Sequence, residues 1–451
     1  MTPRDENIGL LGENLDRLTQ PGKYYIPKFE SVPSAVVCPA SGEYSPQNES
    51  LKALHGPHAG AMGKYSVYDG GVYDGAGRIV PAAIHLGGGR RHLPGIDPPP
   101  APVESLDGAW LWGGVLQPHF GHFLTESLGR LWAWPRVNTL LKGVVWLLPG
   151  EVPPHKVELY AAFARKTFMA DVFGLLGIEG THHVVTAPIA VRRLVVPNQL
   201  MMNLGGRGIA GHAVFRNFVR RMAESAPQQA PAERKPIYVS RAGMGTAGRF
   251  VLEEQIEAAF SAAGWRVLRP ETMGIAEQIA TYATADRLIF AEGSALHLFA
   301  MVSRPDQKVA VVSRRTPAKV KFQQQLRAYG LQDVHTIDVV TGAVLPMRPN
   351  AEGALMPAYR NDTDVLLDNS ALERALVEHG FLGKGELRLP GPDPVMAAAQ
   401  ATCAARSGEG PHLPWCVVGR EQLQSVPRGP NIREERLAET RAQQRAGAAV
   451  G

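Results

Sequence analysis

The segment from 236 to about 340 alternates short apolar runs with amphipathic stretches, and this alternation limits the fold more than any other feature of the chain. The expected strands are Pro236–Arg241, Trp265–Leu268, Arg287–Ala291, Lys308–Val312 and Val334–Asp338. The expected helices between them are Leu252–Ala263, Ile275–Ala283, Ser294–Ser303 and Val320–Tyr329. Strict alternation with short connections favours a doubly wound α/β domain with a mostly parallel sheet.

A second α/β pattern, weaker than the first, begins near residue 105. Its expected strands are Ala109–Trp112, Gly143–Leu148, His183–Thr186 and Arg193–Pro197, with helices over roughly 155–175 and 211–224. The polar, proline-rich stretch Ala226–Lys235 is typical of an interdomain linker. Short apolar runs at Ala35–Cys38 and Tyr65–Tyr68 indicate strands before this pattern. We therefore expect an N-terminal extension of mixed strands and loops over 1–104, α/β domains over 105–230 and 236–385, and a Pro/Gly/Ala-rich, flexible tail over 386–451.

Composition narrows the class of protein. With 451 residues, 45% hydrophobic and 20% charged, the chain suits two or more globular domains. A net charge of +5 is compatible with an anionic ligand, but no dense Lys/Arg run with interleaved aromatic residues indicates nucleic acid. No apolar run reaches the roughly 18 residues of a membrane span, and the first residues lack the order of a signal peptide. Three scattered cysteines favour a reduced, cytoplasmic setting, and leave peripheral membrane association and oligomeric state open.

The stretch Gln117–Trp132 predicts an amphipathic helix that ends near Pro135. Residues four apart share a helix face, so His122, Glu126 and Arg130 are expected together. Such a face can supply a base, a carboxylate that orients it and an anion clamp. The alternative is a surface helix with a Glu126–Arg130 ion pair and an incidental histidine.

A metal site is a second interpretation of the same stretch. His119, His122 and Glu126 would suffice for a catalytic zinc ion in a hydrolase. Pro118 and Gly121 indicate that His119 precedes the helix and does not share its face. His119 is therefore expected close to the site, in the preceding loop.

Three loops of the 236–340 segment carry candidate ligand-binding residues at the carboxyl ends of strands, where open parallel sheets bind ligands. The first places Arg241 and Arg249 around a glycine-rich loop, and paired guanidinium groups suit a diphosphate. The second carries Glu271. The third carries Glu292, Gly293, Ser294 and His297 at the start of a helix whose N–H groups can bind an anion. Neither glycine loop matches a dinucleotide-binding or P-loop motif, which excludes the commonest dehydrogenase and kinase signatures.

These motifs together resemble glycosyltransferase family 61, in particular its bacterial members that make capsular polysaccharide. The resemblance covers roughly 110–340. It rests on three blocks, which are His122–Glu126 with Arg130–Trp132, Tyr238–Arg241 with Arg249 and Glu253–Glu254, and Glu277–Ile279 with Glu292–His297. Two positions depart from the family pattern, because Glu253 and Leu298 stand where asparagine is common.

The resemblance implies a GT-B architecture, in which two Rossmann-like domains face each other across a central cleft. It implies an acceptor-side domain over 105–230 and a nucleotide-sugar-binding domain over 236–385. It also implies inverting transfer from a nucleotide sugar to a glycan or polysaccharide without an essential metal or other cofactor. In agreement, no Asp-x-Asp motif follows an expected strand of the second domain, since Asp362–Asp364 lies outside the strand series.

His122 is then the expected base, because histidine ordinarily titrates near neutrality, and Glu126 orients it. The expected substrate-binding residues are His119, Arg130, Arg241, Arg249, Glu271, Glu292, Gly293, Ser294 and His297. A non-catalytic partner that binds nucleotide sugar in polysaccharide assembly is an alternative, because Glu253 and Leu298 depart from the pattern. The donor sugar, its base and the acceptor are not encoded in any motif.

Overall fold

The computed structural model describes residues 6, 26–44, 66–87, 90–93, 97–149, 167–202, 209–227, 235–244, 248–318, 320–350, 352–359, 363–407 and 414–426. The chain divides into two compact units. The first contains residues 1–228 with the short pieces 274–280 and 297–302, and the second contains the remaining residues. The expected linker lies mostly outside the described residues.

The first unit is built on a mixed eight-stranded sheet with the order β3-β4-β2-β1-β8-β5-β6-β7. Its strands are β1 Phe29–Tyr44, β2 Ser66–Tyr73, β3 His85–Leu86, β4 Arg90–Leu93, β5 Glu104–Val115, β6 Leu141–Leu147, β7 Thr181–Val184 and β8 Ile189–Pro197. Strands β8, β5, β6 and β7 are mutually parallel. The described helices include α4 Phe120–Thr125, α5 Trp134–Val137, α7 Phe168–Leu175, α8 Ala213–Val219 and α9 Arg221–Ser225. This parallel half agrees with the expected α/β pattern.

The described residues between 26 and 104 are part of the first unit and not a separate extension, contrary to the sequence-based expectation. Strand β1 pairs antiparallel with β8, from Phe29 opposite Pro197 to Val37 opposite Ile189. Inward-facing Val32, Ala35 and Val37 join the same apolar core as the strands β5, β6 and β8. The apolar run at Ala35–Cys38 therefore pairs with a strand more than 100 residues away in sequence, which local patterns do not reveal.

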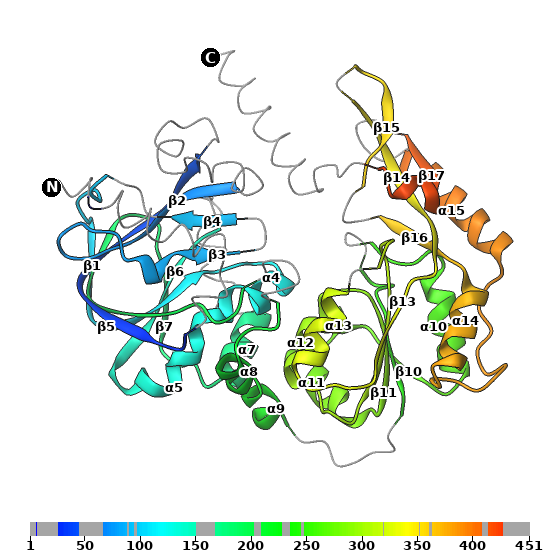
Figure 1. Ribbon diagram of the computed structural model, residues 1–451, viewed down its shortest axis with the longest axis horizontal. Helices are drawn as coiled ribbons and strands as arrows, with labels where there is room; N and C mark the ends of the chain where they lie inside the picture. Colours follow the sequence, from blue (N-terminus) through cyan, green and yellow to red (C-terminus); the bar gives the residue numbers. More distant parts are fainter. Residues whose placement is uncertain are drawn as a thin grey trace. The chain divides into compact units, whose positions relative to one another are not determined.

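The second unit contains the expected parallel sheet, and every predicted strand and helix of this segment is confirmed. The strand order is β10-β9-β11-β12-β13, and all neighbours are parallel. The strands are β9 Ile237–Val239, β10 Arg266–Leu268, β11 Arg287–Ala291, β12 Lys308–Val312 and β13 Val334–Ile337. The helices between these strands are α10 Glu253–Ala262, α11 Ile275–Thr284, α12 Ala295–Val302 and α13 Lys321–Ala328, of which residues 275–280 and 297–302 are assigned to the first unit. Helices α11, α12 and α13 cover one face of the sheet, and α10 covers the other (Figure 1).

The described residues 363–407 and 414–426 of the second unit form helices, strands and their connections, so the prediction of a flexible tail over 386–451 is wrong for 392–407 and 414–426. A further sheet is formed by β14 Val340–Pro349, β15 Leu355–Pro357, β16 Asp364–Leu367 and β17 Trp415–Gly419. Helices α14 Asn369–Glu378, α15 Pro392–Ser407 and α16 Arg420–Leu423 accompany it. Alanine side chains of α15 pack against Val344 and Leu366 in the hydrophobic core. Because these side chains are small, the helix can approach the sheet closely.

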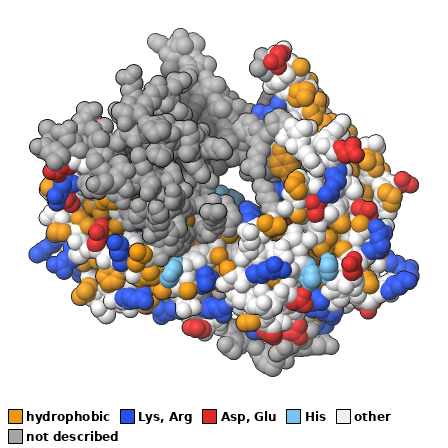
Figure 2. All heavy atoms as spheres, viewed as in Figure 1, with side chains coloured by type: hydrophobic (Ala, Val, Ile, Leu, Met, Phe, Trp, Pro, Cys, Tyr) orange, Lys and Arg blue, Asp and Glu red, His pale blue; other side chains and the backbone are white. Residues whose placement is uncertain are grey.

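The described surface is mixed in character. Basic, acidic and hydrophobic side chains are interspersed over the described part of the face in Figure 2. Within the described residues, no helix combines the length and apolar character needed to span a bilayer.

A buried histidine in the first unit makes stability depend on pH. The ring of His182 stacks on Phe173 at 4.2 Å between centroids, and its Nδ1 accepts a hydrogen bond of 3.0 Å from Trp146 Nε1. Burial lowers the pKa of His182 to about 4, so folding favours the neutral ring. The unfolded chain binds a proton near pH 6.5, which means that stability is complete above that pH and falls between about 6.5 and 4.

We expect acid to cost about 3 kcal/mol of unfolding free energy through this ring. Replacing His182 with Asn keeps an acceptor for Trp146 but removes the titration. Urea unfolding at pH 7.5 and pH 5 should therefore show a smaller loss of stability in His182→Asn than in the parent. The same substitution at the neighbouring His183 serves as control, and equal acid sensitivity of His182→Asn and the parent would refute the assignment.

Candidate active site

His122 and Glu126 form a hydrogen-bonded pair at the end of α4, which follows β5. The Nδ1 atom of His122 lies 2.6 Å from Glu126 Oε1. Because a carboxylate only accepts, Nδ1 carries the hydrogen and Nε2 keeps the lone pair that can take up a proton. The His122 side chain is 45% exposed, whereas Glu126 is 2% exposed. An accessible imidazole oriented by a buried carboxylate is the arrangement of a general base.

The single helix predicted over this stretch is wrong. Helix α4 ends at Thr125, and Ser127–Ala133 continue as a 3-10 helix, followed by α5. The hydroxyl of Ser127 accepts from Gln117 N and donates to Val115 O, which ties the turn to the end of β5. Gly129 is required there, since a Cβ atom would overlap the carbonyl oxygen of Met201. The chain also continues through Pro135, which occupies the first turn of α5, where no intrahelical N–H is needed.

This break separates Arg130 from His122. Arg130 is 1% exposed, and its guanidinium group donates to the carbonyl oxygens of Ala82, Ile84 and Pro197. Arg130 therefore has a structural role and not the expected role of binding an anion. It joins the end of β8 to the segment before β3. Of the three side chains expected on one helix face, only His122 and Glu126 contact each other.

His119 occupies the N-cap position of α4, before the helix as expected. Its exposed ring lies 5.1 Å from the ring of His122, between centroids, in an edge-on arrangement. Among the described residues, no group of three His, Cys, Asp or Glu side chains is placed to hold a metal ion. The hydrolase site composed of His119, His122 and Glu126 is thus not formed.

The order of the parallel sheet predicts where the second unit binds a ligand. The chain runs from β9 to β10 on one side and then returns to β11 on the other side of β9. Ligands bind outside the carboxyl ends of strands at such a reversal. Arg241 follows β9, Glu292 and Gly293 follow β11, and Arg314 follows β12. The sheet therefore gathers three predicted residues and one that the sequence analysis missed.

Arg241 is held at this edge by close packing. It is 8% exposed, and its Nε donates to Gly248 O at 3.0 Å. A Cβ atom at residue 293 would overlap Arg241 Nη1, so a glycine is required there for the guanidinium group to pack. Burial and the nearby charge of Arg314 lower the pKa of Arg241 to about 9, which leaves it protonated at neutral pH. A buried cation with such a shift at a strand end indicates an anion site.

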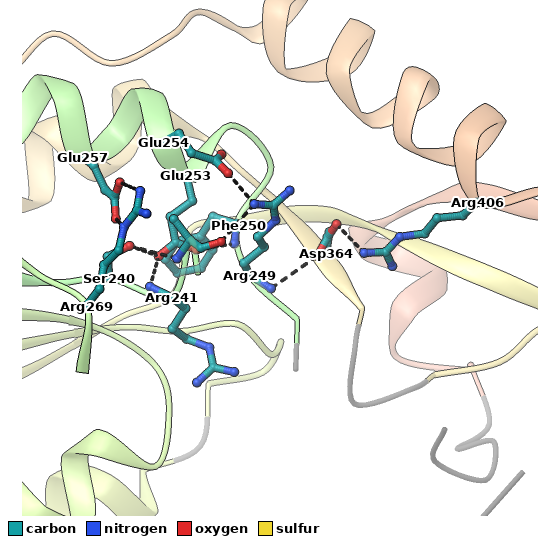
Figure 3. Close-up of polar contacts among 11 residues, drawn as sticks. Ser240, Arg241, Arg249, Phe250, Glu253, Glu254, Glu257, Arg269, Asp364 and Arg406 are labelled. Atoms are coloured by element: carbon teal, nitrogen blue, oxygen red, sulfur yellow. Dashed lines mark hydrogen bonds and ion pairs between the residues drawn. The ribbon is translucent and has the colours of Figure 1, made fainter. Parts of the chain in front are cut away.

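Glu253 explains how the loop after β9 is fixed (Figure 3). Its fully buried carboxylate accepts hydrogen bonds from Arg241 N at 2.6 Å, Phe250 N at 2.9 Å and the hydroxyl of Ser240 at 3.2 Å. Both ends of the glycine-rich loop are thus tied to the first residue of α10. The departure from asparagine at this position therefore has a structural role, since a longer acceptor spans both loop ends.

Glu292 organises the two arginines that follow β12. Its Oε2 accepts from Arg314 N at 3.0 Å, and Arg315 Nη1 lies 3.1 Å from its Oε1. Burial would raise the pKa of Glu292, but Arg315 and Arg314 outweigh this effect and hold it below its ordinary value. The sequence feature that could have identified Arg314 and Arg315 is their position just after an expected strand, at the same edge of the sheet as Arg241.

Residues 120–310 match the family model described as glycosyltransferase 61. This segment of the chain belongs to glycosyltransferase family 61. None of the curated proteins compared with the chain matches it. The family assignment made from the three motif blocks is confirmed, and it favours the enzyme over the non-catalytic alternative.

The matched segment of this glycosyltransferase runs from α4 to β12. It contains His122, Glu126, Arg241 and the Glu253 acceptor, and it ends before Arg314 and Arg315. The second departure from the family pattern, Leu298, is fully buried within α12. A leucine there is part of the buried hydrophobic core.

The remaining predicted residues of the glycosyltransferase lie around the same edge of the parallel sheet. Arg249 is 35% exposed and pairs with Glu254, while its Nη1 donates to Ala242 O at 3.0 Å. Glu271 is exposed after β10 and packs against Gly243. Ser294 is half-buried directly before α12, and His297 is buried one turn into that helix. Arg249, Glu271 and Ser294 lie in loops at the sheet edge, whereas His297 is buried within a helix.

Asp364, from the sequence Asp362–Asp364, hydrogen-bonds to the end of the glycine-rich loop and to helix α15. It lies in β16, outside the parallel sheet, as expected. One of its oxygens accepts from Arg249 N at 3.3 Å, and the other from Arg406 Nη2 at 2.8 Å (Figure 3). The folded C-terminal segment thereby braces the residue that follows the glycine-rich loop.

Proposed function

We propose that this glycosyltransferase transfers a sugar from a nucleotide-sugar donor to a hydroxyl group of a glycan or polysaccharide acceptor, with inversion at the anomeric carbon and within the GT-B class. The observation that carries the proposal is the 2.6 Å contact between His122 Nδ1 and Glu126. It leaves Nε2 of an accessible ring able to accept a proton.

In the proposed reaction, His122 Nε2 takes the proton of the acceptor hydroxyl as the hydroxyl oxygen attacks the anomeric carbon. The bond from that carbon to the diphosphate oxygen breaks on the opposite face, so one displacement inverts the configuration. Glu126 keeps Nδ1 protonated and stabilises the imidazolium ion that forms. His119, which adjoins the ring of His122, is proposed to contact the acceptor.

The leaving diphosphate gains negative charge as the bond breaks, and fixed donors can stabilise that charge. We assign this role to Arg241, Arg249 and the backbone N–H groups that follow Gly293, at the start of α12. Glu271 and Ser294, at the same sheet edge, are proposed donor contacts. Because positive side chains are already gathered at this edge, the proposal includes no essential metal ion.

The decisive experiment is a thermal-shift panel of nucleotide sugars, followed by a product-release assay with the stabilising donor. One donor should raise the melting temperature selectively, because a ligand that binds only the folded state stabilises it. Nuclear magnetic resonance of the product then reports the anomeric configuration. The absence of stabilisation by every donor, or a product with retained configuration, would contradict the proposal.

Arg249 provides a separate test of donor binding. We expect Arg249→Ala to weaken binding of the selected nucleotide by about tenfold, or about 1.4 kcal/mol, since one charge-assisted contact is lost and the pair with Glu254 is given up. Calorimetry measures this affinity directly. Arg269→Ala is the matched control, because it removes a comparable pair with Glu257 on the same helix. Unchanged affinity in Arg249→Ala would remove this residue from the site.

A further inference from the structure

Arg314 and Arg315 follow β12 directly and lie beyond the segment that matches the family. Arg314 Nη1 and Arg241 Nε both donate to the carbonyl oxygen of Gly248, at 3.1 and 3.0 Å. Two guanidinium groups therefore converge on one neutral group at the end of the glycine-rich loop. Arg315 completes the cluster from the other side of Glu292, and 30% of its side chain is exposed.

Backbone carbonyl groups and one buried carboxylate hold Arg314 and Arg315 in place. Arg314 donates from Nε to Glu292 O at 2.7 Å and from its backbone N to the Glu292 carboxylate. The hydroxyl of Ser313 also donates to that carboxylate, at 3.1 Å. One buried carboxylate thus orients two consecutive arginines, and it neutralises at most one of them.

The charges in this cluster are mutually unfavourable. Burial and Arg315 lower the pKa of Arg314, just as burial and Arg314 lower that of Arg241. The other nearby carboxylates are Glu271 and Glu253, and burial raises the pKa of Glu253 in spite of its hydrogen bonds. Like charges gathered in a protein interior are costly unless an anion joins them.

We propose that Arg314 and Arg315 bind the diphosphate group of the donor together with Arg241, and that Glu292 is the positioning residue of this cluster. The inference rests on the proposed function and extends it to residues that no motif contains. Arg315, the most exposed of the three, contacts the phosphate oxygens from the solvent side. Planar guanidinium groups suit this task, because each offers two parallel donors to a phosphate.

The test compares R315Q with the parent in calorimetric titrations with a nucleoside diphosphate, its nucleoside and inorganic pyrophosphate. We expect R315Q to weaken diphosphate and pyrophosphate binding by about 10- to 100-fold and to leave nucleoside binding unchanged. R327Q, which removes an exposed arginine from α13, is the matched control and should bind all three as the parent does. Because Arg315 is partly exposed, R315Q is expected to fold, and its melting temperature verifies this.

The outcomes separate this inference from the proposed function. If the parent binds the nucleoside diphosphate and R315Q binds it equally well, the inference is overturned and the proposed function stands. If the parent binds pyrophosphate through Arg315 but no nucleotide, the anion site stands and the proposed function fails. If the parent binds neither, both are overturned.

Discussion

Replacing His122 with alanine is expected to lower the rate of sugar transfer by about 100- to 10,000-fold, which is the usual contribution of a general base. The substitution removes the nitrogen that accepts the acceptor proton. It leaves the arginine cluster of the second unit intact, so affinity for the nucleotide sugar should stay within about twofold. Release of nucleoside diphosphate under saturating donor and acceptor measures the rate, and calorimetry measures the affinity.

His183→Ala is the matched control for this experiment. His183 also faces a glutamate, with its Nε2 atom 4.0 Å from Glu104 Oε1, but it lies on β7 and has no proposed part in transfer. The control should turn over at the parent rate. Near-normal turnover of a folded His122→Ala variant would exclude His122 as the base, whereas a parallel loss of donor affinity would indicate a binding role.

The parallel sheet of the second unit could be predicted in full because its signals are local. Each strand contains a short apolar run, and the central strands β9, β11 and β12 are buried on both faces. Helices α10, α11 and α13 each have an amphipathic period of their own. Once alternation fixes the topology, the carboxyl ends of strands must share an edge. The sequence alone therefore predicts that Arg241, Glu292 and Gly293 lie at the same edge of the sheet.

The structure of the segment that contains His122 and Arg130 could not be predicted in this way. Periodicity indicates which side chains could share a face, but it does not show that Ser127 bonds to β5 and breaks the helix. The same limit applies to Arg130, whose partners are carbonyl groups about 50 and 70 residues away in sequence. Long-range backbone contacts of this kind have no local signature.

The predictions for the two ends of the chain were wrong for a related reason. Strands β1 and β17 pair with β8 and β14, which are distant in sequence, and β1 itself contains several serine, proline and glycine residues. Such segments resemble loops when they are considered alone. Arg314 and Arg315 were missed differently, because a charged pair after a strand is most often solvated, and only the contacts with Glu292 distinguish it.

Arg241→Ala is expected to lower turnover by about 100- to 1000-fold, as the loss of one fixed donor to a developing anion typically does. A second variant tests the position of the same group without removing it. In Gly293→Ala the added methyl group must displace Arg241 Nη1, so turnover should fall in the same direction but by a smaller factor. The backbone at Gly293 does not require a left-handed conformation, and the variant should therefore fold.

The control for Gly293→Ala is Gly391→Ala, where an added Cβ atom meets no neighbouring atom. This variant should retain the turnover and nucleotide affinity of the parent. Steady-state rates and calorimetric affinities of the three variants then separate loss of the guanidinium group from its displacement. If Gly293→Ala folds and matches the parent in both, the packing of Arg241 against residue 293 has no part in transfer, and only the charge of Arg241 can matter.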